Sequence, residues 1–152
     1  MERAQLIKHL MGGEAFMPID KVLEEVSFDR IGERIHGLPY SFYEVFYHIT
    51  YAQKDILDYI ISDNYTAQKW PEAYWDDKKA PETENEWEQL KSRFFKERQD
   101  LADYILDENN DLQKPVKNSK DHTLLWELLL VIEHNAYHTG QLIVLLRLLG
   151  DH

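Results

Sequence analysis

Residues 123–150 read TLLWELLLVIEHNAYHTGQLIVLLRLLG, and this stretch decides the fold of the chain. The segment is apolar on most sides, and Gly150 follows it as a signal for the end of a helix. A helix that is apolar almost all round packs against neighbours on several sides. We therefore predict a long helix from about Thr123 to Leu149 at the centre of a helical domain.

Two capping boxes mark the starts of two further helices, since each has a Ser or Thr followed three residues later by Glu. One box, Ser41-Phe42-Tyr43-Glu44, opens a helix that extends to about Ser62. The other box, Thr83-Glu84-Asn85-Glu86, precedes an apolar stripe with a helical spacing of three and four residues. The stripe consists of Trp87, Leu90, Phe94, Leu101 and Ile105. Both segments are predicted to be long helices.

The first forty residues predict one interrupted helix. A helical stretch near Glu2 to Leu10 is followed by the break Gly12-Gly13, and Pro18 suits the first turn of a new helical piece. No alternating pattern of β-branched residues indicates a strand. Four helical segments and an apolar content of 43% predict an all-α four-helix bundle in one domain, residues 1–152.

The connection from Asn64 to Glu82 is too long for a tight turn between antiparallel helices. Such a connection could cross the bundle and let the second and third helices run parallel. Its aromatic residues between Trp70 and Trp75 have two interpretations. They could anchor the loop to the bundle, which is the commoner use of loop aromatics, or close over a binding site.

Charge and composition restrict the functional classes. The net charge of −11 would repel nucleic acid and anionic lipid, so neither is expected as a partner. The chain contains no cysteine, which excludes a zinc–thiolate site and leaves His, Asp and Glu as metal ligands. The N-terminus lacks the layout of a secretory signal, and no apolar run is long enough to span a bilayer. We expect a soluble, cytoplasmic protein.

Three histidines are candidates for a metal site. His134 and His138 are four residues apart, so both project from one face of the predicted helix. That face is largely apolar, and unpaired imidazoles there would lack solvent. His48 lies in the middle of the helix predicted from Ser41 to about Ser62, on a face that also points inward. The pattern predicts that the three side chains meet inside the bundle and bind one divalent metal ion.

Other interpretations of these histidines stay open. The pair at i and i+4 is a short and unspecific pattern, and each imidazole could instead bond a neighbouring side chain or carbonyl without any metal. Neutral imidazole suits zinc, nickel, copper or iron(II). Three protein ligands would leave coordination positions for water or substrate, as in catalytic metal sites. The remaining histidines, His9, His36, His122 and His152, fit a site less well.

The chain resembles the DinB-like superfamily, which includes the YfiT-like group of metal-dependent hydrolases. His48 in the stretch 41–48 matches, and residues 134–141, HNAYHTGQ, are similar to the family signature H-x-x-x-H-x-G-Q. Helix order, the two long loops at residues 64–82 and 107–121, and the overall length also agree. The resemblance therefore covers nearly the whole chain.

This resemblance implies an up-down-down-up four-helix bundle that is often dimeric. It also implies a nickel or zinc ion held by His48, His134 and His138, with manganese or iron as alternatives. Gln141 could support a ligand from the second layer or serve packing. Some relatives are transferases or isomerases that use a low-molecular-weight thiol. The apolar residues 142–149 exceed what one bundle covers, which favours a homodimer independently.

Candidate catalytic residues come from the third helix. Glu97 and Arg98 interrupt its apolar stripe where a strict pattern would place an apolar side chain. They offer a general base and a positive charge, although both could be solvated or paired on a slightly rotated helix. Glu133, Tyr51, Asp55 and Tyr137 are alternatives for orienting a ligand imidazole.

Two functions from different classes follow. The first is a metal-dependent enzyme acting on a small molecule, either a hydrolase or a thiol S-transferase in detoxification or stress response. The second is a non-enzymatic, stress-related binding protein in which a structural metal braces two helices. Loss of stability when the metal is removed would favour the structural role, because binding energy is then folding energy.

Overall fold

The computed structural model describes residues 2–152, and within that range it is helical with no β-strand beyond one isolated bridge between Pro115 and Thr123. The five α-helices are α1 (Glu2–Met11), α2 (Ile19–Glu25), α3 (Phe42–Ile61), α4 (Glu84–Leu106) and α5 (Leu124–Leu149). Three short 3-10 turns, η1 (Phe28–Arg30), η2 (Ile35–Gly37) and η3 (Glu72–Tyr74), lie in the connections. The prediction of an all-α fold is confirmed.

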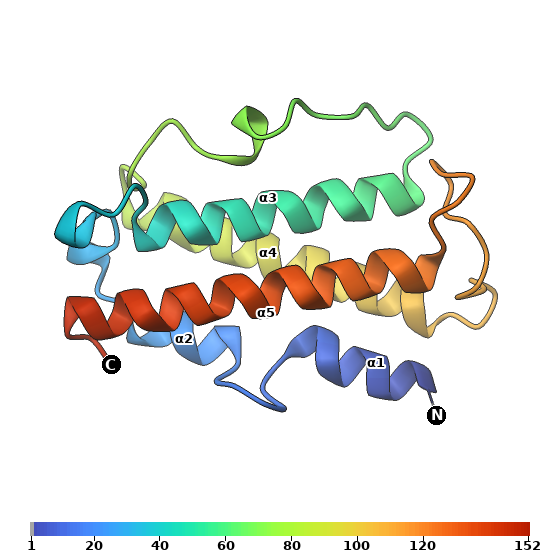
Figure 1. The fold of residues 1–152 in the computed structure, drawn as a ribbon, viewed down its shortest axis with the longest axis horizontal. Helices are drawn as coiled ribbons and strands as arrows, with labels where there is room; N and C mark the ends of the chain where they lie inside the picture. The colour runs from blue at the N-terminus through green and yellow to red at the C-terminus, as the bar shows by residue number, and fades with distance from the viewer. Residues whose placement is uncertain (1) are drawn as a thin grey trace.

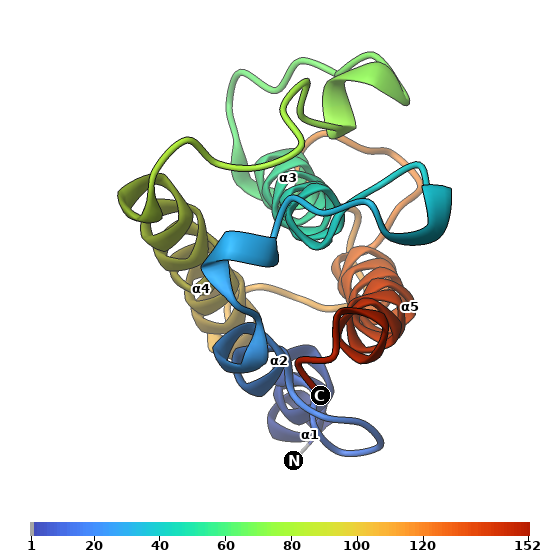
Figure 2. The ribbon, with the colours of Figure 1, turned by 90° about the vertical axis from the view of Figure 1, so that its left-hand side faces the viewer.

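The long helices lie roughly side by side, and α1 and α2 follow one another along the fourth side of the bundle (Figures 1 and 2). Figure 1 shows α3 and α4 running in the same direction, opposite to α5 and to the α1–α2 pair. The helix α3 contacts both α4 and α5. It therefore takes part in two helix interfaces, one with α4 and one with α5.

The first helix is interrupted where the sequence predicts the break. Gly12 and Gly13 have φ angles of 79° and 89°, in the left-handed region that glycine adopts at little steric cost. Pro18 then forms the extended N-cap of α2, with φ of −65°. One side of the bundle is consequently formed by two short helices joined by residues 12–18.

The ends of α3 and α5 match the sequence signals. Ser41 and Glu44 form the complete capping box, and Gly150 ends α5 with a left-handed φ of 80°. At the start of α4, the Thr83 side chain accepts a hydrogen bond from the backbone N–H of Glu86, as predicted. The Glu86 carboxylate, however, accepts from the backbone N–H of Glu82 rather than from Thr83, so the second box is not reciprocal.

The core has two apolar parts. One is centred on Phe42, Phe46 and Phe94, and the other on Leu101 and Leu128. Buried polar side chains occupy intermediate positions along the long helices. They include His48, Thr50 and Gln53 on α3, Glu97 and Arg98 on α4, and Asn135, His138 and Thr139 on α5. The middle of the bundle is therefore polar, and candidate functional groups concentrate there.

The connection from α3 to α4 crosses back over the outside of α3 (the green segment in Figure 1). Its return end is fastened to the start of α3, where the Ser41 hydroxyl donates to the Lys79 carbonyl at 2.6 Å. A Cβ placed on Gly32 would lie 2.4 Å from the Cβ of Ala80, so the loop packs directly on glycine. This crossover brings residues 70–75 over the middle of α3.

None of the helices in residues 2–152 combines the length and the apolar character needed to cross a membrane.

Candidate metal centre

The structure brings together the three histidines that the sequence singled out. His48 projects from α3, and His134 and His138 project from successive turns of α5. Each offers a ring nitrogen, and these nitrogens all lie within 4.8 Å of one another. The closest contact joins His48 Nε2 and His134 Nε2 at 3.0 Å. Whether they bind a metal stays a prediction.

Hydrogen bonds from behind the cluster fix which nitrogen of two rings faces inward. The Nδ1 of His48 lies 3.1 Å from the carbonyl oxygen of Tyr74, and the Nδ1 of His138 lies 2.6 Å from Gln141 Oε1. Both oxygens can only accept, so each Nδ1 carries the proton and donates. In a neutral imidazole, Nε2 then bears a free lone pair. Gln141 therefore does contact a candidate ligand.

Burial keeps the three imidazoles uncharged at neutral pH. Desolvation lowers the pKa of His48 to about 4, against the opposing effect of its hydrogen bond to Tyr74. Desolvation, with the nearby His138 and His48, lowers the pKa of His134 to about 3. The pKa of His138 is also lowered by burial. Neutral rings present lone pairs to a cation rather than repelling it.

The donor set fits a divalent metal ion. Imidazole nitrogens bind zinc at about 2.0–2.1 Å, so two of them on one ion lie about 3 to 3.5 Å apart. The 3.0 Å between His48 Nε2 and His134 Nε2 falls in this range. Because the lone pair of His48 Nε2 points into the cluster, a cation there would satisfy it. Within residues 2–152 the cluster contains three ligand residues and no carboxylate.

The crossover loop covers this cluster. The ring of Trp75 stacks on that of His48, with centroids 4.3 Å apart and planes 5° apart. Tyr74 supplies the carbonyl that orients His48, and its phenol donates to Asp55 on α3 at 2.5 Å. Residues 74–75 therefore anchor the loop to the bundle and cover one face of His48, while closure over a binding site stays a prediction.

The candidates for orienting an imidazole have different positions. Asp55 accepts hydrogen bonds from Tyr65 and Tyr74, so it reaches His48 only through the backbone of Tyr74. Tyr137 is 67% exposed and its ring edge meets His138 at 4.8 Å between centroids. Glu133 is exposed. Tyr51 packs against Tyr74, so of the four only Tyr137 meets a ring of the cluster directly, and Asp55 acts through Tyr74.

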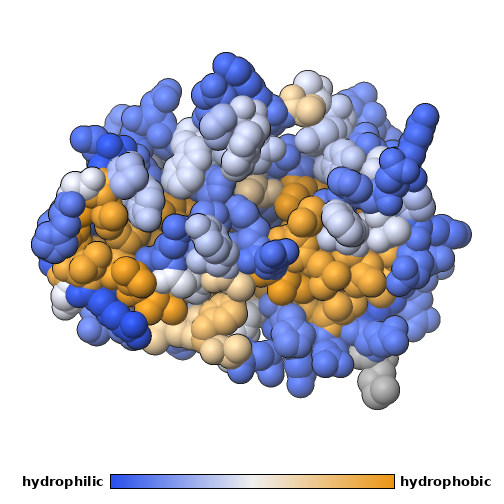
Figure 3. Space-filling model, viewed as in Figure 1, coloured by the Kyte–Doolittle hydropathy of each residue, from blue (hydrophilic) through white to orange (hydrophobic). Residues whose placement is uncertain are grey.

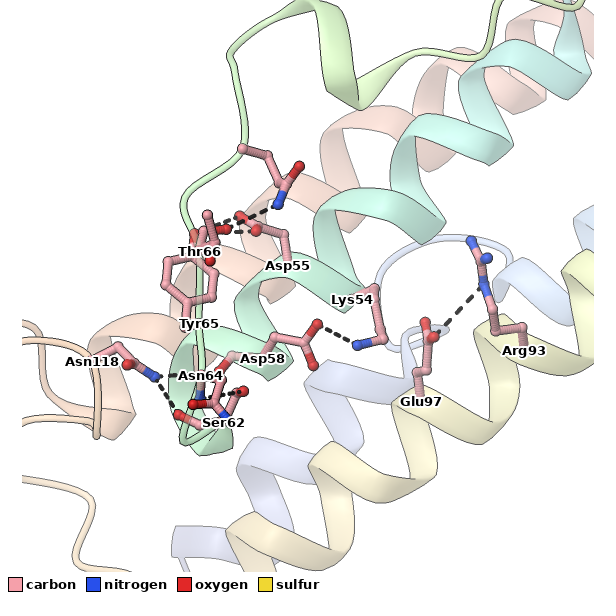
Figure 4. A network of polar contacts seen from close by, with 11 residues as sticks. Lys54, Asp55, Asp58, Ser62, Asn64, Tyr65, Thr66, Arg93, Glu97 and Asn118 are labelled. Atoms are coloured by element: carbon pink, nitrogen blue, oxygen red, sulfur yellow. Dashed lines mark hydrogen bonds and ion pairs between the residues drawn. The ribbon is translucent and has the colours of Figure 1, made fainter.

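Glu97 and Arg98 are placed elsewhere. The Arg98 Nε donates to Gln53 Oε1 at 2.9 Å, and its guanidinium lies over the ring of Phe94. Figure 4 shows Glu97 beside Arg93, with an N–O distance of 3.7 Å. These contacts belong to α4 and its interface with α3, whereas the histidines lie between α3 and α5. In the described part of the chain, neither side chain hydrogen-bonds a histidine of the cluster.

Of the alternative that both side chains are solvated or paired, pairing describes Glu97, which is buried beside Arg93, while Arg98 is buried with a hydrogen bond to Gln53. The interruption of the apolar stripe indicated that residues 97 and 98 are unusual. It did not predict which neighbours their side chains contact. The sequence reasoning also missed the carbonyl of Tyr74, since a backbone group carries no residue-type signal. The stacking of Trp75 was signalled only by the cluster of aromatic residues in the loop.

The fold and the cluster together define an all-helical protein with three converging histidines that could hold a metal ion. Residues 15–152 match the model of the DinB family, and the chain belongs to that family. The match includes α2 to α5 and all three histidines. Comparison with curated proteins and with solved structures found no match.

Proposed function

We propose that this DinB-family protein binds one divalent metal ion through His48, His134 and His138 and uses it in an enzymatic reaction on a small molecule. Nickel or zinc is the proposed ion, with manganese or iron as alternatives, because neutral imidazole suits late first-row metals best. The observation that carries the proposal is the convergence of three uncharged rings, two of them oriented from behind by Tyr74 and Gln141.

A metal bound there would act as a Lewis acid that lowers the pKa of a bound water or thiol. The protein's own residues supply orientation and shielding. Tyr74 and Gln141 hold two imidazole tautomers with Nε2 facing inward, and Trp75 covers one face of His48. Three protein ligands leave coordination positions for a reacting group, as in catalytic zinc sites.

A groove beside the cluster supports a substrate with an apolar part. It has a volume of about 340 Å³ and shares Tyr137 and Gln141 with the surroundings of His138. Its other lining residues are Leu38, Tyr40, Gly140, Val144, Leu145 and Leu148. We propose hydrolysis of such a substrate, or transfer to it of a low-molecular-weight thiol, as the two reactions to compare.

The experiment is a substrate panel on metal-loaded protein. Esters and amides with apolar acyl groups test hydrolysis, and electrophiles offered with a low-molecular-weight thiol test S-transfer. We expect turnover in one of the two sets and its loss in His134→Ala. Equal product formation by both proteins, or none with any metal, would contradict the enzymatic proposal.

The rival function is a binding protein braced by a structural metal. It is favoured by one observation, that the cluster joins α3 to α5, two helices in extensive contact. Chelation separates the two roles. A structural ion would be needed for folding, so its removal would unfold the protein, whereas removal of a catalytic ion would abolish turnover with a small change in melting temperature.

We also propose a homodimer formed through α5. Figure 3 shows apolar surface on the face of the molecule where α5 lies. The exposed apolar side chains of α5 are Trp126, Leu129, Leu130, Tyr137, Val144 and Leu148. Light scattering should give twice the monomer mass, and Leu129→Glu, at an exposed α5 position outside the groove, should reduce it. A monomeric wild-type protein at micromolar concentration would contradict this proposal.

A further inference from the structure

Arg98 is a permanently charged group enclosed in the middle of the bundle. Arg98 is only 4% exposed. Within residues 2–152, the guanidinium makes one hydrogen bond, from Nε to Gln53, and its Nη2 is buried without a partner. The face of the guanidinium lies 4.3 Å from the ring centroid of Phe94. Most of its donor capacity is therefore unused.

The charge of Arg98 also lacks compensation. Burial lowers the pKa of Arg98 to about 9, and no neighbouring carboxylate opposes this effect. The adjacent Glu97 pairs with Arg93 instead. A buried charge is tolerated when a counter-charge or hydrogen bonds replace the lost water. The single contact to the Gln53 amide supplies only part of this.

A cavity reaches Arg98 from the side of the bundle formed by α1 and α2. Its volume is about 590 Å³. It is lined by Met11, Gly12, Pro18, Ile19, Asp20, Phe95, Arg98 and Gln99. The break at Gly12 and Gly13 separates α1 from α2, and the cavity lies where the end of α1 and the start of α2 meet α4. Residues on both sides of the break therefore line a cavity that also borders Arg98.

We propose that this cavity binds a small organic carboxylate, whose carboxyl group pairs with the guanidinium of Arg98. The planar fork of a guanidinium matches the two oxygens of a carboxylate. Met11, Ile19 and Phe95 offer apolar contact to the body of the ligand. Asp20 on the same lining and the net charge of −11 disfavour a dianion such as phosphate.

This site is distinct from the histidine cluster. Arg98 contacts α3 through Gln53, on the side of α3 that faces α4, whereas His48 faces α5. The proposal therefore does not depend on the metal or on the proposed reaction. One ligand would occupy the cavity beside the Gly12–Gly13 break and pair with the guanidinium of Arg98.

The test is a titration of sodium benzoate into metal-loaded, full-length protein, followed by calorimetry and by amide NMR spectra. We expect saturable binding that shifts the resonances of Gly12, Gly13 and Gln99 but not that of Gly140. Benzamide, the uncharged isostere, should bind at least about tenfold more weakly, because it cannot form the charged pair. Inorganic phosphate is a second arm and should also bind more weakly than benzoate.

Variants separate this site from the metal. Arg98→Met should weaken benzoate binding at least about tenfold, and Asp20→Asn, at a solvent-exposed position, should tighten it about twofold. His134→Ala should bind benzoate as the wild type does, which distinguishes the cavity from carboxylate binding to the metal. No saturable binding, equal binding of benzamide, or shifts confined to Gly140 and its neighbours would overturn the proposal, even if Arg98→Met fails to fold.

Discussion

The two sides of α3 bury polar groups in opposite ways. Towards α5, His48 belongs to a cluster of neutral rings, two of which have a hydrogen-bond acceptor behind them. Towards α4, Gln53 meets Arg98, a fixed positive charge with one hydrogen bond. The first region carries no charge of its own and could hold a cation. The second contains a buried cation, and within residues 2–152 its Nη2 has no hydrogen-bond partner.

This difference shows how a small bundle can keep a polar middle. Neutral imidazoles can be buried when their N–H groups are satisfied, and they keep their lone pairs available. A guanidinium cannot discharge, so its surroundings must adapt to it. The following four predictions test each side of the comparison, in order of decreasing effect.

The largest effect is expected for His134→Ala. Protein purified without chelator should contain about one equivalent of divalent metal per chain, and the variant should contain almost none, because two imidazoles hold an ion much less well than three. Elemental analysis measures this. The matched control is His36→Ala, an exposed histidine outside the cluster, which should retain the metal. Equal metal content in the wild type and His134→Ala would remove the basis of the proposed function.

On the other side of α3, Gln53→Leu should lower the free energy of unfolding by about 2–4 kcal/mol, since it leaves the Arg98 Nε unpaired in the core and removes the side-chain hydrogen bond to the Phe94 carbonyl. Urea denaturation measures the change. Gln89→Leu on the exposed surface of α4 is the control and should alter stability by less than about 0.5 kcal/mol. Similar values for both variants would mean that Gln53 does not support the buried charge.

Tyr74→Phe should weaken metal binding about tenfold without abolishing it. The phenol of Tyr74 holds the loop to Asp55, and the same residue's carbonyl orients His48. Loss of such second-layer support typically reduces metal affinity by about 10- to 100-fold. Competition with a chelator gives the affinity. Tyr65→Phe also removes a phenol from Asp55 but leaves the carbonyl in place, so an equal loss there would count against orientation of His48.

The smallest effect concerns pH and Glu97. Burial raises the pKa of the Glu97 carboxyl, partly offset by Arg93, so the native chain holds this proton more tightly than the unfolded chain does. Stability from the protonated form is complete below pH 4.5 and is lost as the pH rises through the native pKa.

Glu97→Gln should therefore be more stable than the wild type at pH 7 and similar to it at pH 4. Thermal unfolding at the two pH values measures the difference. Glu88→Gln, on the exposed side of α4, is the matched surface control. A variant that is less stable than the wild type at pH 7 would show that the ionised carboxylate contributes through Arg93 more than its burial opposes.

Much of the fold could be predicted because its signals are local. The Ser41 box, the left-handed Gly150 and the Gly12–Gly13 break each depend on a few neighbouring residues. The Thr83 box was only half correct, since Glu86 has two backbone N–H groups within reach and bonds that of Glu82. Helical periodicity also placed the three histidines on inward faces.

The surroundings of the histidines could be predicted only in part. Gln141 lies three residues after His138, a spacing that helix geometry brings together. Tyr74 lies 26 residues after His48, and the contact depends on the path of a loop and on a backbone oxygen. For Glu97 and Arg98, periodicity indicated burial, but a small rotation of α4 decides which neighbour each one meets.

The crossover loop has a consequence for how the length of this chain can vary. Its outgoing part, residues 66–69, is exposed, so insertions there would change little beyond the surface. The return part is different, because Tyr74 and Trp75 contact His48 and Ala80 meets Gly32. One added residue between Trp75 and Ala80 would move the Tyr74 carbonyl relative to His48 Nδ1 while Ala80 stays against Gly32. Length variation among related chains should therefore concentrate before residue 70.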